Sequence, residues 1–126
     1  MNFLLAEDYE FNALLVKEKL KSAGDSCTVV INGKEAVDLL KTRTDFDAVL
    51  MDLEMPVLDG REATRIIRSE LCNVNKNIPI IAVTGYEMDE VKSDQKKYGF
   101  DYILLKPIDM KELEKIKKQI NLTNRL

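Results

Sequence analysis

Apolar and amphipathic stretches alternate five times along the chain. The apolar stretches are short and continuous, as is typical of strands that are buried on both faces of a parallel sheet. We therefore predict strands at residues 2–6, 28–31, 47–51, 78–83 and 101–105.

Each apolar stretch is followed by a stretch with helical periodicity. The predicted helices span residues 10–23, 34–41, 61–72, 86–98 and 110–121. Strands and helices that alternate in this way form a doubly wound α/β fold, in which helices cover both faces of a five-stranded parallel sheet. No linker, repeat or low-complexity tract interrupts the pattern, so we expect a single domain over residues 1–126.

The helices differ in how much apolar surface they offer to the core. The first is expected to stop at Gly24, and a turn at Asn32-Gly33 is expected before the second. The expected inward residues are Ala13, Val16, Leu20 and Ala23 in the first helix, Ala63, Ile66, Ile67 and Leu71 in the third, and only Met88, Val91 and Tyr98 in the fourth. The fourth helix is therefore expected to be weakly anchored, and weakly packed elements are where switching tends to occur.

Composition and charge narrow the class of function. The chain is 45% hydrophobic and 33% charged with a net charge of −3, so it is neither a disordered chain nor a basic nucleic-acid-binding protein. It has no bilayer-length apolar run, no signal-peptide layout and two isolated cysteines, Cys27 and Cys72, which favours a cytoplasmic protein with free thiols and no direct membrane contact. The absence of histidine excludes histidine-based nucleophilic catalysis and most zinc sites.

Charged and hydroxyl side chains follow four of the five predicted strands. They belong to Glu7 and Asp8, to Asp52, to Thr84, and to Lys106. Because the carboxyl ends of parallel strands meet at one edge of a sheet, we expect these groups to lie together beside the topological switch point.

This set of residues suits phosphoryl chemistry. Three crowded carboxylates repel one another unless a cation neutralises them, and Mg²⁺ (or Mn²⁺) prefers such oxygen ligands. Lys106, Thr84 and the backbone N–H of Gly85 can bind a phosphoryl group, and Asp52 can accept it as an aspartyl phosphate. Each acid alone is also explained as a helix cap or a solvated loop residue, but the coincidence of four strand ends favours the phosphoryl site.

Four segments, LLAEDYEFN, VLMDLEMPVLDGREATRIIR, IIAVTGY and GFDYILLKPI, occur in an order and spacing typical of one family. Together they resemble the receiver domain of two-component response regulators, in particular the receivers of hybrid histidine kinases and phosphorelays. The resemblance covers essentially the whole chain and implies a flavodoxin-like (βα)5 fold with strand order 2-1-3-4-5. It also implies a histidine kinase or histidine phosphotransfer domain as phosphodonor, and a monomer or weak dimer that is not a turnover enzyme.

The resemblance implies a role for each residue that would touch the phosphoryl group. Asp52 is expected to be the phosphoacceptor, taking the group from a phosphohistidine on a partner. Lys106 is expected to pair with the group, and Thr84 to swing toward it and form a hydrogen bond. The Lys106-Pro107 peptide bond is expected to be cis.

The resemblance also implies a metal site. Asp8 and Asp52 are expected to bind Mg²⁺ directly, the backbone carbonyl of Glu54 to be a third protein ligand, and Glu7 to act through water. The side chains of Glu54 and Tyr86 lie two residues beyond the acceptor and the threonine, where the family tunes the lifetime of the phosphoryl group. An acid at Glu54 can repel the phosphate or orient the attacking water, and both alternatives stay open.

One position departs from the family pattern. The switch aromatic of the family usually lies three residues before the lysine, where this chain has Ile103. Tyr102 is adjacent but is expected to point to the opposite face of its strand. The usual coupling of threonine movement to an aromatic rotamer is therefore not assigned to Tyr102.

Two surface features are candidates for partner recognition and switching. Phe11, Leu14 and Leu15 lie off the main apolar face of the first helix, so they are either covered by neighbouring loops or form a docking surface for a phosphodonor helix. For the weakly anchored helix at 86–98, our hypothesis is that phosphorylation orders or shifts it.

Two other functions use similar residues. A haloacid-dehalogenase-like phosphatase combines an Asp nucleophile with Mg²⁺, a hydroxyl and Lys, but its nucleophile lies on the first strand, and the Glu7-Asp8 pair would have no role. A pseudo-receiver would be an interaction module that never takes up phosphate. Because no output domain follows the last helix, we expect either a stand-alone phosphorelay carrier or the receiver of a hybrid kinase.

Overall fold

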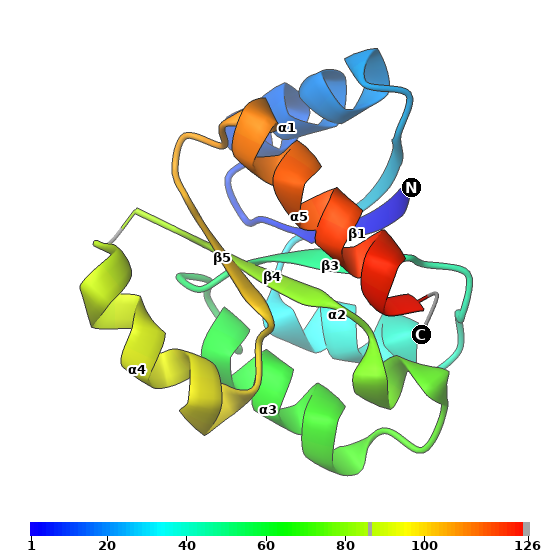
Figure 1. Cartoon of the computed structure of the whole chain (residues 1–126). Helices are drawn as coiled ribbons and strands as arrows, with labels where there is room; N and C mark the ends of the chain where they lie inside the picture. The colour runs from blue at the N-terminus through cyan, green and yellow to red at the C-terminus, as the bar shows by residue number, and fades with distance from the viewer. Residues whose placement is uncertain (86, 125–126) are drawn as a thin grey trace.

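The structure is a computed structural model that describes residues 1–85 and 87–124. Its strands are β1 (Asn2–Ala6), β2 (Ser26–Val30), β3 (Ala48–Asp52), β4 (Ile80–Thr84) and β5 (Tyr102–Leu105). They form one parallel sheet in the order β2-β1-β3-β4-β5, which confirms the predicted fold class and strand order (Figure 1). Every strand boundary lies within two residues of its predicted position.

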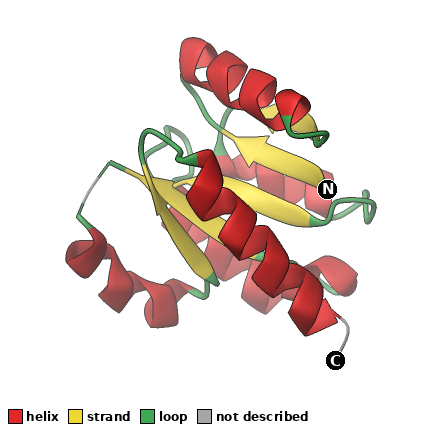
Figure 2. Ribbon diagram, turned by 45° about the horizontal axis from the view of Figure 1, so that its top comes forward, coloured by secondary structure: helices red, strands yellow, loops and turns green. Residues whose placement is uncertain are grey.

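Helices cover both faces of the sheet. They are α1 (Glu10–Ser22), α2 (Gly33–Leu40), α3 (Gly60–Glu70), α4 (Met88–Tyr98) and α5 (Met110–Asn124), with a short 3₁₀ helix at Val74–Asn77. Helices α1 and α5 lie on one face, and α2, α3 and α4 lie on the other (Figures 1 and 2). None of the helices in the described ranges is both long and apolar enough to cross a membrane.

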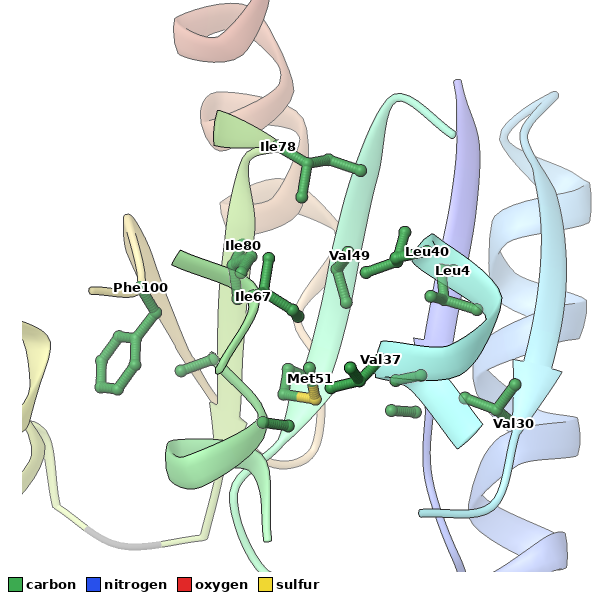
Figure 3. Packing of buried hydrophobic residues seen from close by; sticks show 14 of the residues in the cluster. Leu4, Val30, Val37, Leu40, Val49, Met51, Ile67, Ile78, Ile80 and Phe100 are labelled. Carbon is green, nitrogen blue, oxygen red and sulfur yellow. The ribbon is translucent and has the colours of Figure 1, made fainter. Parts of the chain in front are cut away.

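The apolar runs form strands because both faces of the sheet are covered. Every residue of β3 and β4 is buried. Alternate strand residues pack toward opposite helix layers. One cluster lies between the sheet and helices α2, α3 and α4, and it includes Leu4, Val37, Leu40, Val49, Met51, Ile67 and Ile80 (Figure 3). A second cluster lies between the sheet and helices α1 and α5, and it includes Phe3, Leu5, Leu20, Leu50, Ile81, Leu113 and Ile120.

Two local predictions are wrong, and one short element was missed. Asn32-Gly33 is not a separate turn, because the side chain of Asn32 accepts the N–H of Glu35 at 2.8 Å and α2 begins at Gly33. Ala23 is exposed, since α1 ends at Ser22 and Ala23 is its C-cap, followed by Gly24 with a φ of 84°. The 3₁₀ helix was not predicted.

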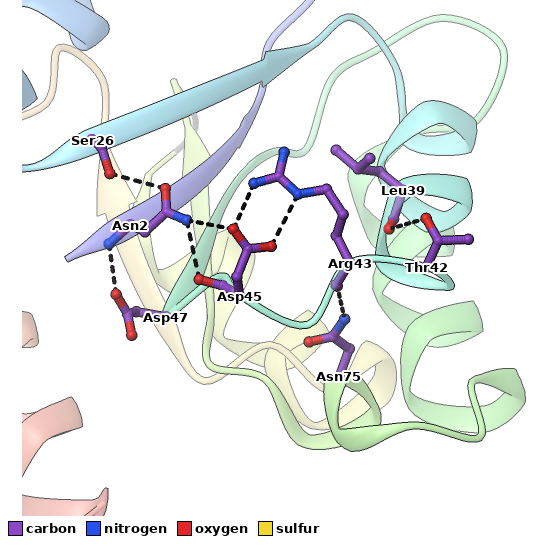
Figure 4. Close-up of polar contacts among 8 residues, drawn as sticks. All are labelled: Asn2, Ser26, Leu39, Thr42, Arg43, Asp45, Asp47 and Asn75. Atoms are coloured by element: carbon purple, nitrogen blue, oxygen red, sulfur yellow. Dashed lines mark hydrogen bonds and ion pairs between the residues drawn. The ribbon is translucent and has the colours of Figure 1, made fainter.

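Polar contacts hold together the amino-terminal edge of the sheet (Figure 4). The side-chain amide of Asn2 donates to the carbonyl of Asp45 at 3.1 Å, and the guanidinium of Arg43 donates to the carboxylate of Asp45 at 2.7 Å. The buried Asn75 amide donates to the carbonyls of Leu40 at 2.8 Å and Arg43 at 2.7 Å. These contacts fix the segment between α2 and β3 at the edge opposite the carboxyl ends of the strands.

Helix α4 is thinly anchored, as predicted. Val91 is its one fully buried side chain among the described residues, while Met88 and Tyr98 are partly buried. No side chain of the described residues caps its first turn, and Gly99 ends it in a left-handed conformation with a φ of 97°. The helix was predicted to start at residue 86, which lies outside the described residues.

Candidate functional site

The sheet brings the predicted site residues to one edge. Asp52 and Thr84 are the last residues of β3 and β4, while Glu7 directly follows β1 and Lys106 directly follows β5. The main chain holds these ends in register, because Glu7 donates its N–H to Val30 at 3.0 Å and Lys106 donates its N–H to Thr84 at 2.8 Å. The Lys106-Pro107 bond is cis, as expected.

Three carboxylates converge at this edge. One oxygen from each of Glu7, Asp8 and Asp52 lies within 4.8 Å of the others. Asp8 is exposed, but Glu7 and Asp52 retain only 5% and 3% of their accessible surface. Two carboxylates are thus buried and the third is exposed. Burying ionised carboxylates costs free energy unless a positive charge lies nearby.

Lys106 supplies that positive charge. Its ammonium donates to Oδ2 of Asp52 at 2.9 Å and to Oε2 of Glu7 at 3.4 Å. Burial alone would lower the pKa of Lys106, but the bonds and charges of Asp52 and Glu7 outweigh burial and raise it. The other oxygen of Asp52 accepts the backbone N–H of Glu54 at 3.0 Å, so both oxygens of Asp52 are held in place.

Glu7 remains poorly compensated. Burial, followed by the hydrogen bond and the charge of Asp52, raises the pKa of the Glu7 carboxyl from 4.5 to about 7, against the opposing effect of Lys106. Its Oε1 is buried and accepts no well-formed hydrogen bond within the described structure, although the nearby Asn12 amide lowers the pKa slightly. An acid in this position favours a proton or a cation close by.

Close backbone packing fixes the direction of Asp52. A Cβ on Gly60, the first residue of α3, would lie 2.2 Å from the carbonyl oxygen of Asp52. Gly60 also donates its N–H to Leu53 at 3.2 Å, and Asp59 caps α3 by accepting the N–H of Glu62 at 3.0 Å. The chain after β3 can therefore return to the sheet directly beside Asp52.

Tyr102 and Ile103 lie on opposite faces of the sheet. Tyr102 packs with the cluster under α1 and α5, whereas Ile103 packs with the cluster under α3 and α4. Ile103 pairs with Ala82, and the buried Thr84 lies two residues further along β4 on the same face. An aliphatic side chain therefore occupies the face shared with Thr84, in agreement with the decision not to assign the switch role to Tyr102.

A cavity opens beside the carboxylates, between α1 and the segment after β5. Its lining includes Glu7, Asp52 and Lys106 together with apolar residues such as Val16 and Ile108. At its rim, α1 presents an apolar patch to solvent, and Leu15 of this patch also lines the cavity. Three side chains make up this α1 patch: Phe11, Leu14 and Leu15, which are 58%, 55% and 46% exposed. The alternative that neighbouring loops cover them is wrong.

The contacts of Arg61 were not predicted from the sequence. Its guanidinium donates to Asp94 of α4 at 2.8 Å and to the side chain of Glu54 at 3.1 Å. Arg61 and Asp94 are 33 positions apart, and no local pattern indicates that they meet.

The family comparison agrees with this geometry. The family model for the response regulator receiver domain matches residues 3–118. The chain belongs to this family. Membership rules out the phosphatase alternative, because the receiver domain carries its candidate acceptor, Asp52, on the third strand.

The relatives of this receiver domain are parts of larger signalling proteins. The chain is 40% identical over 120 residues to hybrid signal transduction histidine kinase I of Dictyostelium discoideum, covering 90% of the chain and 7% of that protein. It is 36% identical over 114 residues to sensor protein GacS of Pseudomonas syringae pv. syringae, covering 90% of the chain and 12% of that protein. The chain therefore spans only a small part of the length of these curated relatives.

Solved receiver domains share the fold. The receiver domain of a sensor histidine kinase from Pseudomonas aeruginosa, with a magnesium ion coordinated in its active site cleft, aligns with a TM-score of 0.82 and 35% identity over 95% of this chain and 97% of that one. A response regulator receiver from Saccharomyces cerevisiae, in complex with a histidine phosphotransfer protein, aligns with a TM-score of 0.84 and 26% identity over 100% of this chain and 92% of that one. The chain is thus a receiver domain of the kind found in hybrid kinases and phosphorelay proteins, and the comparisons give no support to the pseudo-receiver alternative.

The acidic cluster of this receiver domain fits a hard divalent cation. Its three carboxylates offer oxygen donors that lie within reach of one ion. The unpartnered Oε1 of Glu7 adds a buried acceptor that a metal-bound water would satisfy. The donor set therefore suits Mg²⁺.

Proposed function

We propose that Asp52 accepts a phosphoryl group and that this changes the surface the domain offers to its partners. The observation that carries the proposal is the placement of Asp52. It is a buried acid at a strand end, bonded to Lys106 at 2.9 Å and grouped with two further carboxylates. A purely structural acid does not require this surplus of negative charge.

The transfer step follows from these contacts. One carboxylate oxygen of Asp52 attacks the phosphorus of a phosphohistidine, the new P–O bond forms as the P–N bond breaks, and the electron pair of the broken bond returns to the imidazole of the donor. Lys106 is placed to bind a phosphoryl oxygen, since its ammonium already contacts the acceptor. Thr84 ends the neighbouring strand and is proposed to hydrogen-bond another oxygen.

Asp8, Asp52 and the backbone carbonyl of Glu54 are proposed to hold the metal, with Glu7 acting through water. When bound, Mg²⁺ would supply positive charge against the carboxylates and the phosphoryl oxygens. Mn²⁺ prefers similar ligands and is proposed to substitute for it.

The proposed phosphodonor is a histidine kinase or a histidine phosphotransfer domain. The exposed α1 patch flanks the cavity lined by Asp52, and this position supports a role for the patch in docking the phosphodonor. We further propose a cytoplasmic, monomeric or weakly dimeric phosphoacceptor that is not a turnover enzyme and binds no nucleic acid, formed by residues 1–126 as one domain.

Intact mass after incubation with Mg²⁺ and acetyl phosphate tests the acceptor. We expect a gain of one phosphoryl group in the parent and in the Asp89→Asn control, which removes an exposed acid of α4, and no gain in Asp52→Asn. Where hydrolysis is too fast for an adduct to accumulate, binding of beryllofluoride gives the same information. Failure of the parent to bind beryllofluoride would show that the phosphoacceptor assignment is wrong.

Transfer from a phosphorylated histidine phosphotransfer protein tests the α1 patch. Replacing Phe11 or Leu14 by Ser should slow transfer about tenfold, because an exposed anchor at a protein interface can contribute ~1 kcal/mol or more. Phosphorylation by acetyl phosphate should be unchanged. Leu122→Ser is the matched control, since Leu122 is 60% exposed on α5. Equal slowing in that control would argue against the docking assignment.

A further inference from the structure

Arg61 joins three parts of the molecule outside the acidic cluster. It lies in the first turn of α3 and donates to the carboxylates of Glu54, in the loop after β3, and Asp94, in the middle of α4. The side chains of Arg61 and Asp94 are only 22% and 25% exposed, whereas that of Glu54 is 52% exposed. One guanidinium therefore bridges a partly buried acid of α4 and a more exposed acid of the loop.

The main chain and the side chain of Glu54 contact different parts of the molecule. Its backbone N–H donates to Asp52 at 3.0 Å, so its main chain borders the phosphoacceptor. Its carboxylate instead lines a cleft toward α4 together with Arg61, Glu90 and Val91. Glu54 is absent from the lining of the cavity that holds Glu7, Asp52 and Lys106. The pairing with Arg61 accounts for this direction, since Arg61 is the cation that Glu54 contacts in the described structure.

We propose that Arg61 is a positioning residue that holds the Glu54 carboxylate toward α4 and keeps its charge away from the incoming phosphoryl group. The inference rests on the proposed phosphoacceptor function and deepens it. Without Arg61, an acid two residues beyond Asp52 is free to turn toward an anion that is already surrounded by three carboxylates. Of the two effects open to an acid at this position, Arg61 thus suppresses repulsion of the phosphate.

The same contact couples the site to α4. Arg61 is shared between Glu54 and Asp94, so a movement of α4 that releases Asp94 changes the partners of Arg61 and the freedom of Glu54. Val91 is the one fully buried side chain of α4 among the described residues, and the Gln95 amide adds a hydrogen bond to the carbonyl of Asp101 at 2.7 Å. Because coupling between two sites is reciprocal, a partner that binds and displaces α4 alters phosphoryl binding, and phosphoryl binding alters α4.

Affinity for beryllofluoride in the presence of saturating Mg²⁺ tests the proposal in the full chain. We expect Arg61→Ala to weaken binding roughly two- to fivefold, the range typical of one partly exposed charge pair. Arg61→Lys should recover part of the loss, because it keeps the charge but not the two-sided guanidinium contact. Arg65→Ala is the matched control, since the exposed Arg65 lies on the same helix and, among the described residues, its guanidinium forms its ion pair with Glu62 of that helix.

Glu54→Gln separates positioning from general support of the fold. In the Glu54→Gln background the further change Arg61→Ala should have little effect on beryllofluoride affinity, because no charge remains to be held. An equal loss in both backgrounds would overturn the proposal, as would unchanged binding in Arg61→Ala. Faster loss of the aspartyl phosphate at unchanged beryllofluoride affinity would also overturn it, because Glu54 would then act on the attacking water. If the parent itself binds no beryllofluoride, the proposed function has failed instead.

Discussion

The ammonium of Lys106 lies 2.9 Å from Oδ2 of Asp52, across 54 positions of sequence. It also lies 3.4 Å from Glu7, so a single cation serves two buried acids. A divalent metal at the same carboxylates would compete with Lys106 for them, and a phosphoryl group on Asp52 would replace the carboxylate as its partner. The Lys106–Asp52 ion pair therefore opposes metal binding, and in the proposed phosphorylated state the ammonium would pair with the phosphoryl group instead.

Replacing Lys106 should have opposite effects on these two events. We expect Lys106→Met to raise Mg²⁺ affinity about two- to fivefold, because a competing charge is removed, and to reduce phosphorylation by acetyl phosphate. Calorimetric titration and intact mass measure the two quantities. Lys17→Met makes the same change in net charge on the exposed side of α1 and should alter neither. Unchanged Mg²⁺ affinity in Lys106→Met would contradict the ion pair.

The raised pKa of Glu7 predicts how stability depends on pH in metal-free protein. The folded state holds the proton up to about pH 7, whereas the unfolded state releases it near 4.5. The free energy of unfolding should therefore fall between these values and level off above them. A pKa difference of this size corresponds to a fall of roughly 3 kcal/mol in the free energy of unfolding. We expect a fall of about 1–2 kcal/mol, because water and Lys106 partly compensate the charge of Glu7.

Urea denaturation of the parent and Glu7→Gln between pH 5 and 8, in the presence of a chelator, measures this dependence. The variant should lose the decline and be more stable than the parent above pH 7. Glu10→Gln at the exposed start of α1 controls for net charge. A parent whose stability rises over this range would show that burial does not govern Glu7.

Gly60 should be the least replaceable residue of the loop after β3. A Cβ there would lie 2.2 Å from the carbonyl oxygen of Asp52, with backbone rather than a flexible side chain as the obstacle. We expect Gly60→Ala to lower the free energy of unfolding by about 2–4 kcal/mol and to reduce phosphorylation. Gly85→Ala provides the comparison for stability, because nothing lies within 4 Å of its added Cβ. Similar losses in both variants would indicate a general effect of removing glycine.

Helix α4 should respond to the state of Asp52. Within the part of the chain that the structure describes, it has one fully buried side chain and no side-chain cap at its start, so its amides should exchange faster than those of α3. Beryllofluoride should change this exchange, as measured by mass spectrometry of peptides from α4. Ile103→Ala should alter the response because Ile103 shares a face with Thr84, whereas Tyr102→Phe should not. An α4 that exchanges identically with and without the mimic would refute the switching hypothesis.

Much of this structure could be predicted from the sequence, because parallel strands must place their carboxyl ends at the same edge of the sheet. Once the five apolar runs were assigned, the carboxyl ends of β1, β3, β4 and β5 had to share one edge, which brings Glu7, Asp52 and Lys106 together. Burial could not be predicted in the same way. Asp8 and Glu7 are adjacent, yet one is exposed and the other is 5% exposed, a difference set by the direction in which the chain leaves β1.

Two of the features that were missed depend on contacts between distant residues, and the third depends on where α1 ends. The 3₁₀ helix is held by Asn75, whose amide reaches carbonyls of Leu40 and Arg43 more than thirty positions away. Ala23 fits the inward face of an ideal helix, but the chain leaves the helix one residue earlier. The Arg61–Asp94 pair requires the orientation of two helices, which no local periodicity encodes.

The unpartnered oxygen of Glu7 has a practical consequence. Among the described residues it is the buried side-chain oxygen that lacks a hydrogen-bond partner, and it belongs to the acidic cluster that a cation would neutralise. A ligand that binds only the folded state raises the melting temperature according to its concentration and affinity. The shift in melting temperature of the unlabelled protein can therefore rank divalent ions and phosphoryl mimics by their affinity for this site.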